Sequence, residues 1–329
     1  MAFRAAEPKV VTVVGGSGFL GRYIVRELAL RGWRVRVAVR NTDRALFLRP
    51  MGVVGQIVPV FCNIRDDASV AACVDGADIV INLVGLLYEK GRQTFDAAHS
   101  DGAARIARLA KQAGVGRLIH VSALGASSAS PSRYAQTKAT AEEGVLAAFP
   151  EATIVRPSIV FGPEDGFFNL FARLSRYAPM LPLIGGGNTR FQPVYVVDVA
   201  SAVIACLDNA QTEGQTYELG GPKIYSFKQL MELILTETRR KRGMVRVPWW
   251  AARIQATFLG MMPKPLLTRD QVVLLQADNV VSPEAKTLSD LGIEPTPVET
   301  VLPTYLDKYR VGGRYASSGL AAPGNGGSA

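Results

Sequence analysis

Cysteine and histidine are scarce in this chain of 329 residues, which has three cysteines and two histidines. Cys62, Cys73 and Cys206 show no C-x-x-C spacing, so the sequence predicts neither a disulfide framework nor a metal site and favours a reducing compartment. Long apolar runs are absent too, because the longest, near residues 79–88, is about half of what a bilayer crossing needs. The N-terminus also lacks the apolar core of a signal peptide. We therefore expect no transmembrane segment and no export.

Acidic residues are fewer than basic ones: the chain has 28 aspartates and glutamates and 37 lysines and arginines, which give a net charge of +9. This balance favours an anionic partner, such as a phosphate-bearing cofactor, a nucleic acid, an acidic protein or a membrane surface. Nucleic acid is disfavoured because the basic residues form no recognisable binding motif. Hydrophobic residues make up 48% of the chain, which excludes wholesale disorder.

The order of the apolar segments predicts an α/β fold with a doubly wound parallel sheet. Continuous apolar runs typical of buried parallel strands occur at residues 10–14, 34–39, 57–61, 78–84, 117–122 and 153–156. Helical stretches separate most of them, notably residues 19–31, 67–74, 95–113 and 136–149. This alternation, with right-handed crossovers, is typical of a Rossmann domain.

The alternation becomes irregular after the sixth predicted strand, where several prolines and the run Gly185–Gly187 interrupt it. We assign residues 8–160 to a nucleotide-binding domain, to which segment 192–207 returns. Residues 161–311 are assigned to a smaller C-terminal α/β lobe, a usual place for a substrate cleft. Residues 312–329 are rich in glycine, serine and alanine, which predicts a disordered tail.

A glycine-rich segment lies between the first strand and the first helix, where a Rossmann domain holds the pyrophosphate of a dinucleotide. Gly15 permits a tight turn, Gly18 lets backbone N–H groups approach the pyrophosphate, and Gly21 allows close packing of helix and strand. The candidate residues are Gly15, Gly16, Ser17, Gly18, Phe19, Leu20 and Gly21. A glycine-rich turn without a ligand is the alternative interpretation.

The second strand ends at Arg40, where an NAD site usually carries an acid that accepts hydrogen bonds from the ribose 2′-hydroxyl. A guanidinium suits a 2′-phosphate instead, and Arg44 is placed to assist. The sequence therefore favours NADP(H), with a solvated surface arginine as the alternative.

These glycines and several later segments resemble the short-chain dehydrogenase/reductase superfamily, in its extended or atypical branch, over residues 10–310. The resemblance implies further cofactor contacts just after the strands of the sheet. The residues concerned are Asn63, Ile64, Leu83, Val84, Gly85, Val121, Ser122, Pro157, Ser158 and Ile159.

Tyr134 and Lys138 match the superfamily's Y-x-x-x-K motif, and their spacing places both on one helix face. A nearby ammonium lowers the pKa of a phenol, so the tyrosinate can exchange a proton with a carbonyl or alcohol. The resemblance also implies that Lys138 holds the nicotinamide ribose. The usual serine or threonine is displaced, because Ser122 comes early and Leu124 cannot donate a hydrogen bond, and His99 replaces the branch's helix asparagine. We expect weak catalysis, or a cofactor retained without turnover.

Several segments are more specific, and they resemble the nucleotide-binding accessory subunits of respiratory complex I. They are residues 121–126, 132–138, 149–158, 161–165, 192–199, 267–272 and 288–297. The resemblance implies an NADPH-binding subunit with little or no turnover, near the junction of the peripheral and membrane arms, with other complex I subunits as partners. Its expected place is the cytoplasmic face of a bacterial inner membrane, or the matrix side of a mitochondrial one. An active NADP-dependent reductase, dehydrogenase or epimerase is the first alternative, and an NADP-sensing regulatory protein is the second.

Residues 239–253 carry six basic side chains and no acid, and Trp249 and Trp250 lie among them. Ile254, Phe258, Met261 and Met262 follow at three-to-four-residue spacing. Basic charge beside an amphipathic stretch suits an interface with anionic lipid or an acidic partner. An ordinary lobe helix with solvated arginines is the alternative.

Overall fold

Seven parallel strands form the central sheet in the computed structural model, which describes residues 8–263 and 265–313. The strand order is β11-β6-β5-β4-β1-β2-β3. These strands are β1 (Val10–Val14), β2 (Arg34–Val39), β3 (Ile57–Phe61), β4 (Ile79–Asn82), β5 (Arg117–Val121), β6 (Thr153–Pro157) and β11 (Thr216–Leu219). The predicted doubly wound parallel sheet is confirmed. The order reverses between β1 and β4, and the carboxyl ends of the strands at such a point are where these sheets bind ligands.

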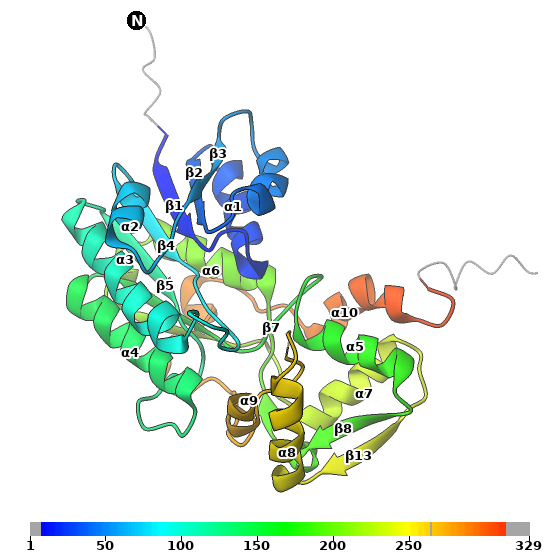
Figure 1. Ribbon diagram of the computed structural model, residues 1–329. Helices are drawn as coiled ribbons and strands as arrows, with labels where there is room; N and C mark the ends of the chain where they lie inside the picture. Colours follow the sequence, from blue (N-terminus) through cyan, green and yellow to red (C-terminus); the bar gives the residue numbers. More distant parts are fainter. Residues whose placement is uncertain (1–7, 264, 314–329) are drawn as a thin grey trace, which may run out of the picture.

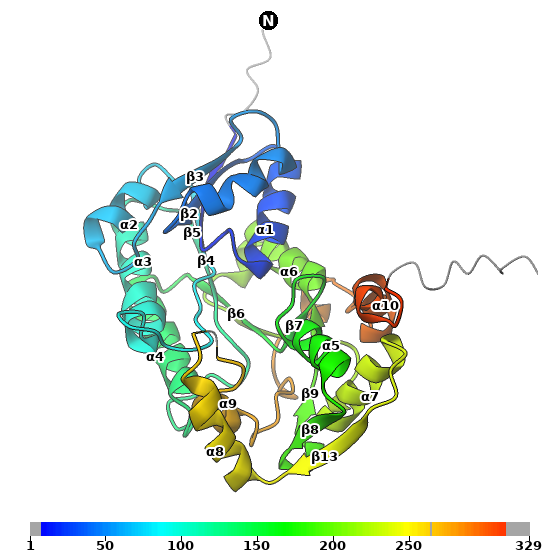
Figure 2. The ribbon, with the colours of Figure 1, turned by 45° about the vertical axis from the view of Figure 1, so that its right-hand side comes forward.

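Helices cover both faces of the sheet (Figures 1 and 2). Side chains of α1 (Phe19–Leu30) and α6 (Val196–Asp208) share one apolar core with the strands. Side chains of α2 (Asp67–Val74), α3 (Asp101–Gln112) and α4 (Arg133–Ala148) form the core on the other face. Because both faces are covered, the strands read as continuous apolar runs, which is why their positions could be predicted.

Helix α4 begins at Arg133, three residues before the predicted start. The Ser132 side chain accepts a hydrogen bond from the backbone N–H of Ala135 at 3.3 Å, and this N-cap places Tyr134 inside the helix. The predicted helix at residues 95–113 is divided into a π-helical turn, Asp96–Ser100, followed by α3.

The smaller lobe packs its helices around an aromatic core that includes Phe161, Phe168 and Phe227. Its main elements are α5 (Phe167–Tyr177), α7 (Phe227–Glu237), α10 (Val298–Leu306) and the parallel pair β8 (Met180–Ile184) and β13 (Gly243–Val247). The shorter strands are β7 (Val160–Phe161), β9 (Arg190–Phe191), β10 (Val194–Tyr195) and β12 (Tyr225–Ser226). Two further helices, α8 (Trp249–Gly260) and α9 (Arg269–Leu274), form an arm beneath α4 (Figure 2).

Strand β11 corrects the predicted division of the chain. The sequence analysis assigned it to the lobe, yet it pairs with β6 and forms one edge of the central sheet. Four residues are too short to show a strand pattern, which explains the error. The predicted tail, residues 312–329, lies outside the described residues from position 314 onward.

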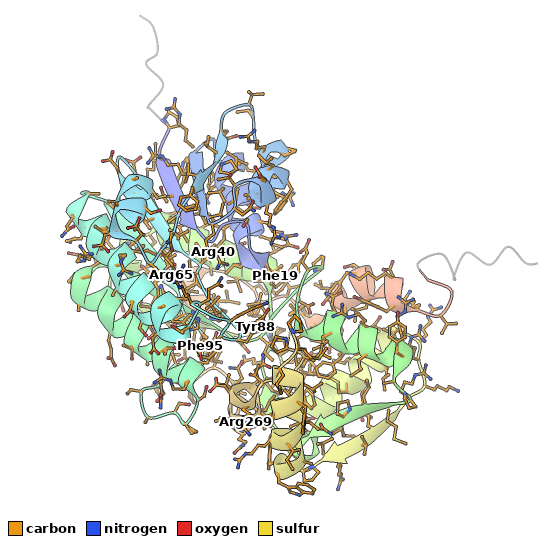
Figure 3. All side chains as sticks on the ribbon, viewed as in Figure 1. Phe19, Arg40, Arg65, Tyr88, Phe95 and Arg269 are labelled. Carbon is orange, nitrogen blue, oxygen red and sulfur yellow. The ribbon has the colours of Figure 1, made fainter. Side chains whose placement is uncertain are left out.

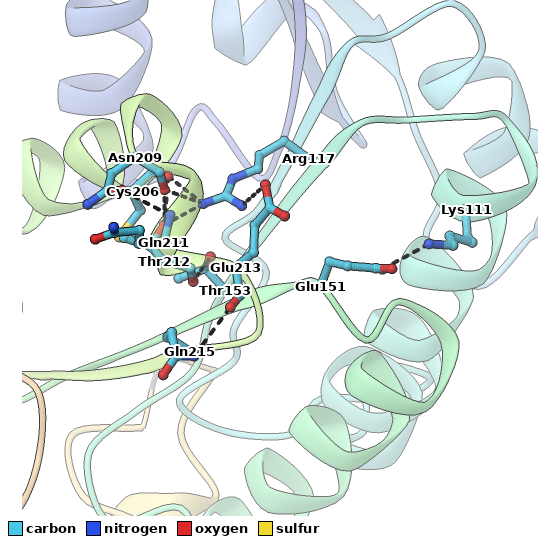
Figure 4. Close-up of polar contacts among 10 residues, drawn as sticks. All are labelled: Lys111, Arg117, Glu151, Thr153, Cys206, Asn209, Gln211, Thr212, Glu213 and Gln215. Atoms are coloured by element: carbon cyan, nitrogen blue, oxygen red, sulfur yellow. Dashed lines mark hydrogen bonds and ion pairs between the residues drawn. The ribbon is translucent and has the colours of Figure 1, made fainter.

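Arg117, at the start of β5, fixes the segment between α6 and β11 (Figure 4). Its Nη2 donates to the carbonyl oxygens of Cys206 at 2.6 Å and Asn209 at 3.1 Å, and its Nη1 lies 2.6 Å from the Glu213 carboxylate. Burial lowers the pKa of Arg117, and the Glu213 carboxylate beside Nη1 offsets part of the cost of burying this charge. Among residues 8–263 and 265–313, no helix combines the length and apolar character that crossing a bilayer requires.

Candidate dinucleotide site

The glycine-rich loop joins β1 to α1 at the point where the strand order reverses. Gly15 has a φ of +81°, a left-handed conformation that favours glycine, and its N–H donates to the Ala38 carbonyl oxygen at 2.9 Å. A Cβ added to Gly21 would lie 2.4 Å from the Gly16 carbonyl oxygen. Glycine is therefore required at position 21 by the backbone of the loop, rather than by a strand as predicted.

The N-terminus of α1 has backbone donors but no side-chain cap. Gly18 precedes the helix, no side chain caps it, and its first turn contains no acid. The free N–H groups and the helix dipole of this 12-residue helix favour an anion. A Cβ on Gly18 would lie 3.2 Å from the Gly15 carbonyl oxygen, so the loop is tightly wound. These features fit the pyrophosphate of a dinucleotide.

The segment after β4 meets both this loop and α4. A Cβ added to Gly15 would lie 3.4 Å from the carbonyl carbon of Leu83 and 3.5 Å from a methyl carbon of Val84. A Cβ added to Gly85 would lie 3.6 Å from Lys138 Nζ. The structure therefore brings the glycine loop, residues 83–85 and Lys138 together.

The residues predicted to contact the adenosine half lie after β2 and β3. Arg40 is exposed at the end of β2, and Arg44 is exposed in the following 3₁₀ segment, Asp43–Met51. Asn63 Oδ1 accepts a hydrogen bond from the Arg65 backbone at 3.3 Å, and Ile64 packs against Gly102. Phe19, Arg40, Arg65, Tyr88 and Phe95 are labelled in Figure 3, where Phe19 and Tyr88 lie toward the smaller lobe.

Tyr134 is packed against two rings, and its ionisation differs from the sequence-based expectation. Its ring meets Phe95 edge-on at a centroid distance of 5.8 Å and His99 at 5.3 Å. Burial and the negative charge of Asp270 raise the pKa of Tyr134 to about 12. The expected lowering by Lys138 is therefore wrong for this arrangement, and the phenol remains protonated at neutral pH.

Lys138 is buried on the inner side of α4. Its Nζ donates to the Val121 carbonyl oxygen at 3.3 Å, and burial lowers the pKa of Lys138 to about 8. The ammonium is thus held beneath residues 83–85 in an environment that penalises its charge.

The third member of the catalytic set has no hydroxyl in a usable position. Ser122 is buried, and its Oγ has no hydrogen-bond partner within the described residues. The backbone N–H of Leu124 donates to the Pro157 carbonyl oxygen at 2.9 Å, while the leucine side chain is buried. Ser158 donates to Asn279 Oδ1 at 2.6 Å, and Ile159 is only partly buried beside it.

His99 has a structural role that follows from its hydrogen bonds. Its Nε2 accepts from the Leu86 backbone N–H at 2.8 Å, so the proton of the neutral ring is on Nδ1, which lies 3.1 Å from Thr137 Oγ1. Burial and the charge of Lys138 lower the pKa of His99 to about 3. The neutral imidazole therefore ties the segment after β4 to α4.

Asp270 is the residue of this site that sequence reasoning missed. It belongs to α9, and its carboxylate accepts hydrogen bonds from the Ser132 hydroxyl at 2.8 Å and from the backbone N–H groups of Arg133 at 2.8 Å and Tyr134 at 3.2 Å. The smaller lobe thus caps the helix that carries Tyr134 and Lys138. No local pattern could have indicated a cap supplied from so far along the chain.

Across residues 8–263 and 265–313, no cluster of three histidine, cysteine or acidic side chains is arranged to bind a metal.

The two buried histidines predict a loss of stability in mild acid. Burial lowers the pKa of His120 to about 3, and its Nδ1 pairs with Asn82 Nδ2 at 3.0 Å. The pKa of His120 in the folded protein is below its unfolded value of 6.5. The stabilisation from the neutral ring is therefore fully present above pH 6.5 and is lost as the pH falls toward 3. Between pH 7 and 5, each buried histidine should lower the free energy of unfolding by about 2 kcal/mol.

Urea denaturation at pH 7, 6 and 5 would measure this effect. His120→Asn keeps an acceptor near the position of Nδ1 and removes the titration, so its loss of stability over this range should be smaller by about 2 kcal/mol than that of the unchanged protein. Parallel stability curves for the two proteins would contradict the prediction.

The family is decided by comparison with known proteins. Residues 11–220 match the model of the NAD dependent epimerase/dehydratase family. The chain belongs to this family. It is 41% identical over 316 residues to NADH dehydrogenase (ubiquinone) 1 alpha subcomplex subunit 9 of Arabidopsis thaliana, covering 92% of this chain and 79% of that protein. It is 34% identical to the NADH-ubiquinone oxidoreductase 40 kDa subunit of Neurospora crassa, covering 92% and 80%. The chain is therefore a member of the family of these complex I accessory subunits, and the predicted resemblance is confirmed.

Two further similarities concern enzymes of this fold. The chain is 36% identical over 200 residues to the ceramide reductase of Caulobacter vibrioides, covering 60% of each protein. Among solved structures, the dTDP-glucose 4,6-dehydratase DesIV of Streptomyces venezuelae, with NAD bound, has a TM-score of 0.70 and 20% identity, covering 90% of this chain and 95% of that one. The second similarity shows the fold alone.

Proposed function

We propose that this chain is an NADP(H)-binding accessory subunit of respiratory complex I with little or no turnover. The observation that carries the proposal is its 41% identity to a complex I subunit across 92% of its length. The likeness extends through the smaller lobe, beyond the residues that match the epimerase family model. A subunit role accounts for similarity over the whole chain better than dinucleotide binding alone.

The residues of the candidate site fit NADP(H). The glycine loop and the α1 N-terminus would hold the pyrophosphate, Arg40 the 2′-phosphate, and Lys138 the nicotinamide ribose. Arg40 is exposed and has no carboxylate partner within the described residues, so its guanidinium is free for a phosphate. When bound, NADPH would supply a hydride donor.

The expectation of little turnover rests on the groups around Tyr134. A phenol whose pKa is raised to about 12 is a weaker acid than an ordinary tyrosine and is almost wholly protonated at neutral pH. It therefore neither gives a proton readily to a carbonyl nor accepts one readily from an alcohol. The buried Leu124 and Ser122 provide no exposed hydroxyl to orient a carbonyl oxygen. His99, which stands where the superfamily has an asparagine, is committed to Leu86 and Thr137.

Tyr134→Phe tests this expectation. We expect the variant to retain nucleotide as well as the unchanged protein, because the phenol makes no hydrogen bond to the described residues and the ring contacts with Phe95 and His99 would be kept. NADPH oxidation against panels of carbonyls and quinones should be negligible for both proteins. Robust turnover that is lost in Tyr134→Phe would favour an active reductase.

The proposed location is a membrane surface, cytoplasmic in a bacterium or on the matrix side of a mitochondrion, with other complex I subunits and anionic lipid as partners. Mild detergent extraction of native membranes, followed by native electrophoresis, tests the assembly. The chain should migrate with NADH:quinone oxidoreductase activity. Migration as a free protein would contradict the proposal.

An active NADP-dependent reductase is the second candidate, favoured by the similarity to a ceramide reductase. The two candidates differ in one measurement, because a reductase should oxidise NADPH when ceramides are supplied and an accessory subunit should not. A regulatory protein that senses NADP is a third candidate, and it predicts complex I activity that changes with the NADPH/NADP⁺ ratio.

A further inference from the structure

Helix α8 reverses the usual pattern of a surface helix. Its small residues Ala252 and Ala256 are buried against the lobe, at 0% and 1% exposure. Its large apolar side chains face outward, in a row that we call the α8 stripe. The stripe consists of Trp250, 68% exposed, Ile254, 52%, Phe258, 69%, and Met261, 81%. The spacing of four, four and three residues places them on one side of the helix.

The neighbouring Trp249 does not belong to this surface, which corrects the sequence-based grouping of the two tryptophans. Its ring packs over Gly185, where an added Cβ would lie 1.9 Å from a ring carbon. Adjacent positions on a helix point about 100° apart. Trp249 is therefore directed toward Gly185, while Trp250 faces outward.

A basic hollow adjoins the α8 stripe, between α8 and α9. Its volume is about 330 Å³, and its lining residues are Arg253, Ile254, Thr257, Arg269 and Val273. Arg269 Nε donates to Thr257 Oγ1 at 2.8 Å, which holds the guanidinium over the hollow. Neither Arg253 nor Arg269 has a carboxylate partner within the described residues. The Thr257 hydroxyl is itself committed, because it donates to the Arg253 carbonyl oxygen at 3.0 Å. Two guanidinium groups suit a phosphate, and Ile254 and Val273 suit an acyl chain.

The segment that carries the α8 stripe has charge of one sign. Residues 239–263 contain no aspartate or glutamate, and Arg246 is exposed on β13, the strand that leads into α8. The nearby acid of α9, Asp270, is turned toward the N-terminus of α4. The surface thus combines apolar side chains with unpaired positive charge.

We propose that the α8 stripe lies in the headgroup region of a bilayer and that the hollow between α8 and α9 binds the phosphate of an anionic phospholipid. A single convex helix with flexible and aromatic side chains, bordered by arginines, is typical of interfacial membrane binding. A phosphate seated between Arg253 and Arg269 places its acyl chains beside Ile254. The arm lies at the end of the molecule opposite the sheet edge formed by β3 (Figures 1 and 2), so a bilayer bound there would face away from that edge.

The bond from Asp270 to α4 fixes the orientation of this surface. Because Asp270 follows Arg269 directly and caps α4, the arm is fastened to the nucleotide domain. A bilayer bound at the arm would therefore orient the whole chain rather than a loose helix.

Flotation of the purified full chain on lipid vesicles tests the proposal. This proposal rests on the membrane location proposed above. The vesicles contain no complex I, so lipid binding and assembly into complex I are tested separately. We expect flotation on phosphatidylcholine vesicles that contain phosphatidylglycerol, and much less on phosphatidylcholine alone. Arg253→Gln with Arg269→Gln should weaken binding to anionic vesicles by about 25-fold, since each basic side chain near the surface contributes roughly fivefold.

Matched variants distinguish binding at this surface from a general effect of exposed apolar side chains or positive charge. Trp250→Ser with Phe258→Ser should abolish flotation, whereas Leu30→Ser with Val54→Ser, which alters two exposed apolar residues in the nucleotide domain, should float like the unchanged protein. Arg34→Gln with Arg49→Gln is the control for charge. Circular dichroism and thermal melting confirm that each variant is folded.

Three results would overturn the proposal. They are failure to float, equal flotation on neutral and anionic vesicles, and unchanged flotation of the Arg253–Arg269 variant. A photoreactive amino acid at position 254 in native membranes adds a direct test. Its attachment to phospholipid supports the proposal, and its attachment to a polypeptide contradicts it.

Discussion

Replacing Lys138 by methionine is expected to make the nucleotide-free protein more stable and to weaken its binding of NADPH. Lys138 is 3% exposed, and burial lowers its pKa from 10.5 to about 8. At pH 7 the folded protein therefore carries a buried ammonium whose desolvation costs about 3 kcal/mol. Methionine has a similar length and no charge, so we expect a gain of about 2 kcal/mol after the hydrogen bond to Val121 is lost.

The dependence on pH identifies the ammonium as the cause. A folded-state pKa below the unfolded value means that the contribution of Lys138 to stability is fully present above pH 10.5 and is lost as the pH falls through about 8. The advantage of Lys138→Met should therefore be largest at pH 7 and should shrink between pH 8 and 10. Urea denaturation at these pH values would measure it.

Nucleotide binding should change in the opposite direction. Losing a charge-assisted hydrogen bond of roughly 1.5–3 kcal/mol weakens affinity about 10- to 150-fold. Calorimetric titration with NADPH would measure this loss, with Tyr134→Phe as the control that keeps affinity. If Lys138→Met were less stable and bound NADPH normally, the lysine would be a structural residue and the proposed ribose contact would be wrong.

The parts of the molecule that could be predicted from the sequence are those that local chemistry determines. The strands of the sheet are apolar runs because both faces are buried. The turn at Gly15 needs a positive φ, and the contact of Gly21 with the backbone of the loop leaves no room for a Cβ. Each requirement is confined to a few neighbouring residues, so each leaves a pattern in the sequence.

The parts that could not be predicted depend on residues far apart in the chain. Strand β11 is recognised as part of the sheet only by its pairing with β6. The pKa of Tyr134 depends on burial and on Asp270, which lies in another lobe, so the motif alone suggested the wrong direction. The outward direction of α8 follows from where Ala252 and Ala256 pack, because a helix with apolar residues on several sides does not reveal which side is buried.

Arg40→Asp is expected to reverse the preference between the two dinucleotides. Arg40 directly follows β2, and the Ala38 carbonyl oxygen two residues earlier accepts a hydrogen bond from Gly15, so position 40 adjoins the loop that would hold the pyrophosphate. A guanidinium there favours a 2′-phosphate, while a carboxylate repels the phosphate and accepts hydrogen bonds from the ribose hydroxyls of NADH.

The expected size of the change follows from one charge-assisted contact. The affinity for NADPH should fall about 10- to 150-fold, and the affinity for NADH should rise. Calorimetric titration of both nucleotides at low and moderate salt would measure the two changes. Arg49→Asp is the control, because Arg49 is also exposed but lies near the far end of the 3₁₀ segment. If the unchanged protein bound NADH and NADPH equally, or if Arg49→Asp had the same effect as Arg40→Asp, the selectivity would come from the net positive charge of the protein rather than from a contact with the 2′-phosphate.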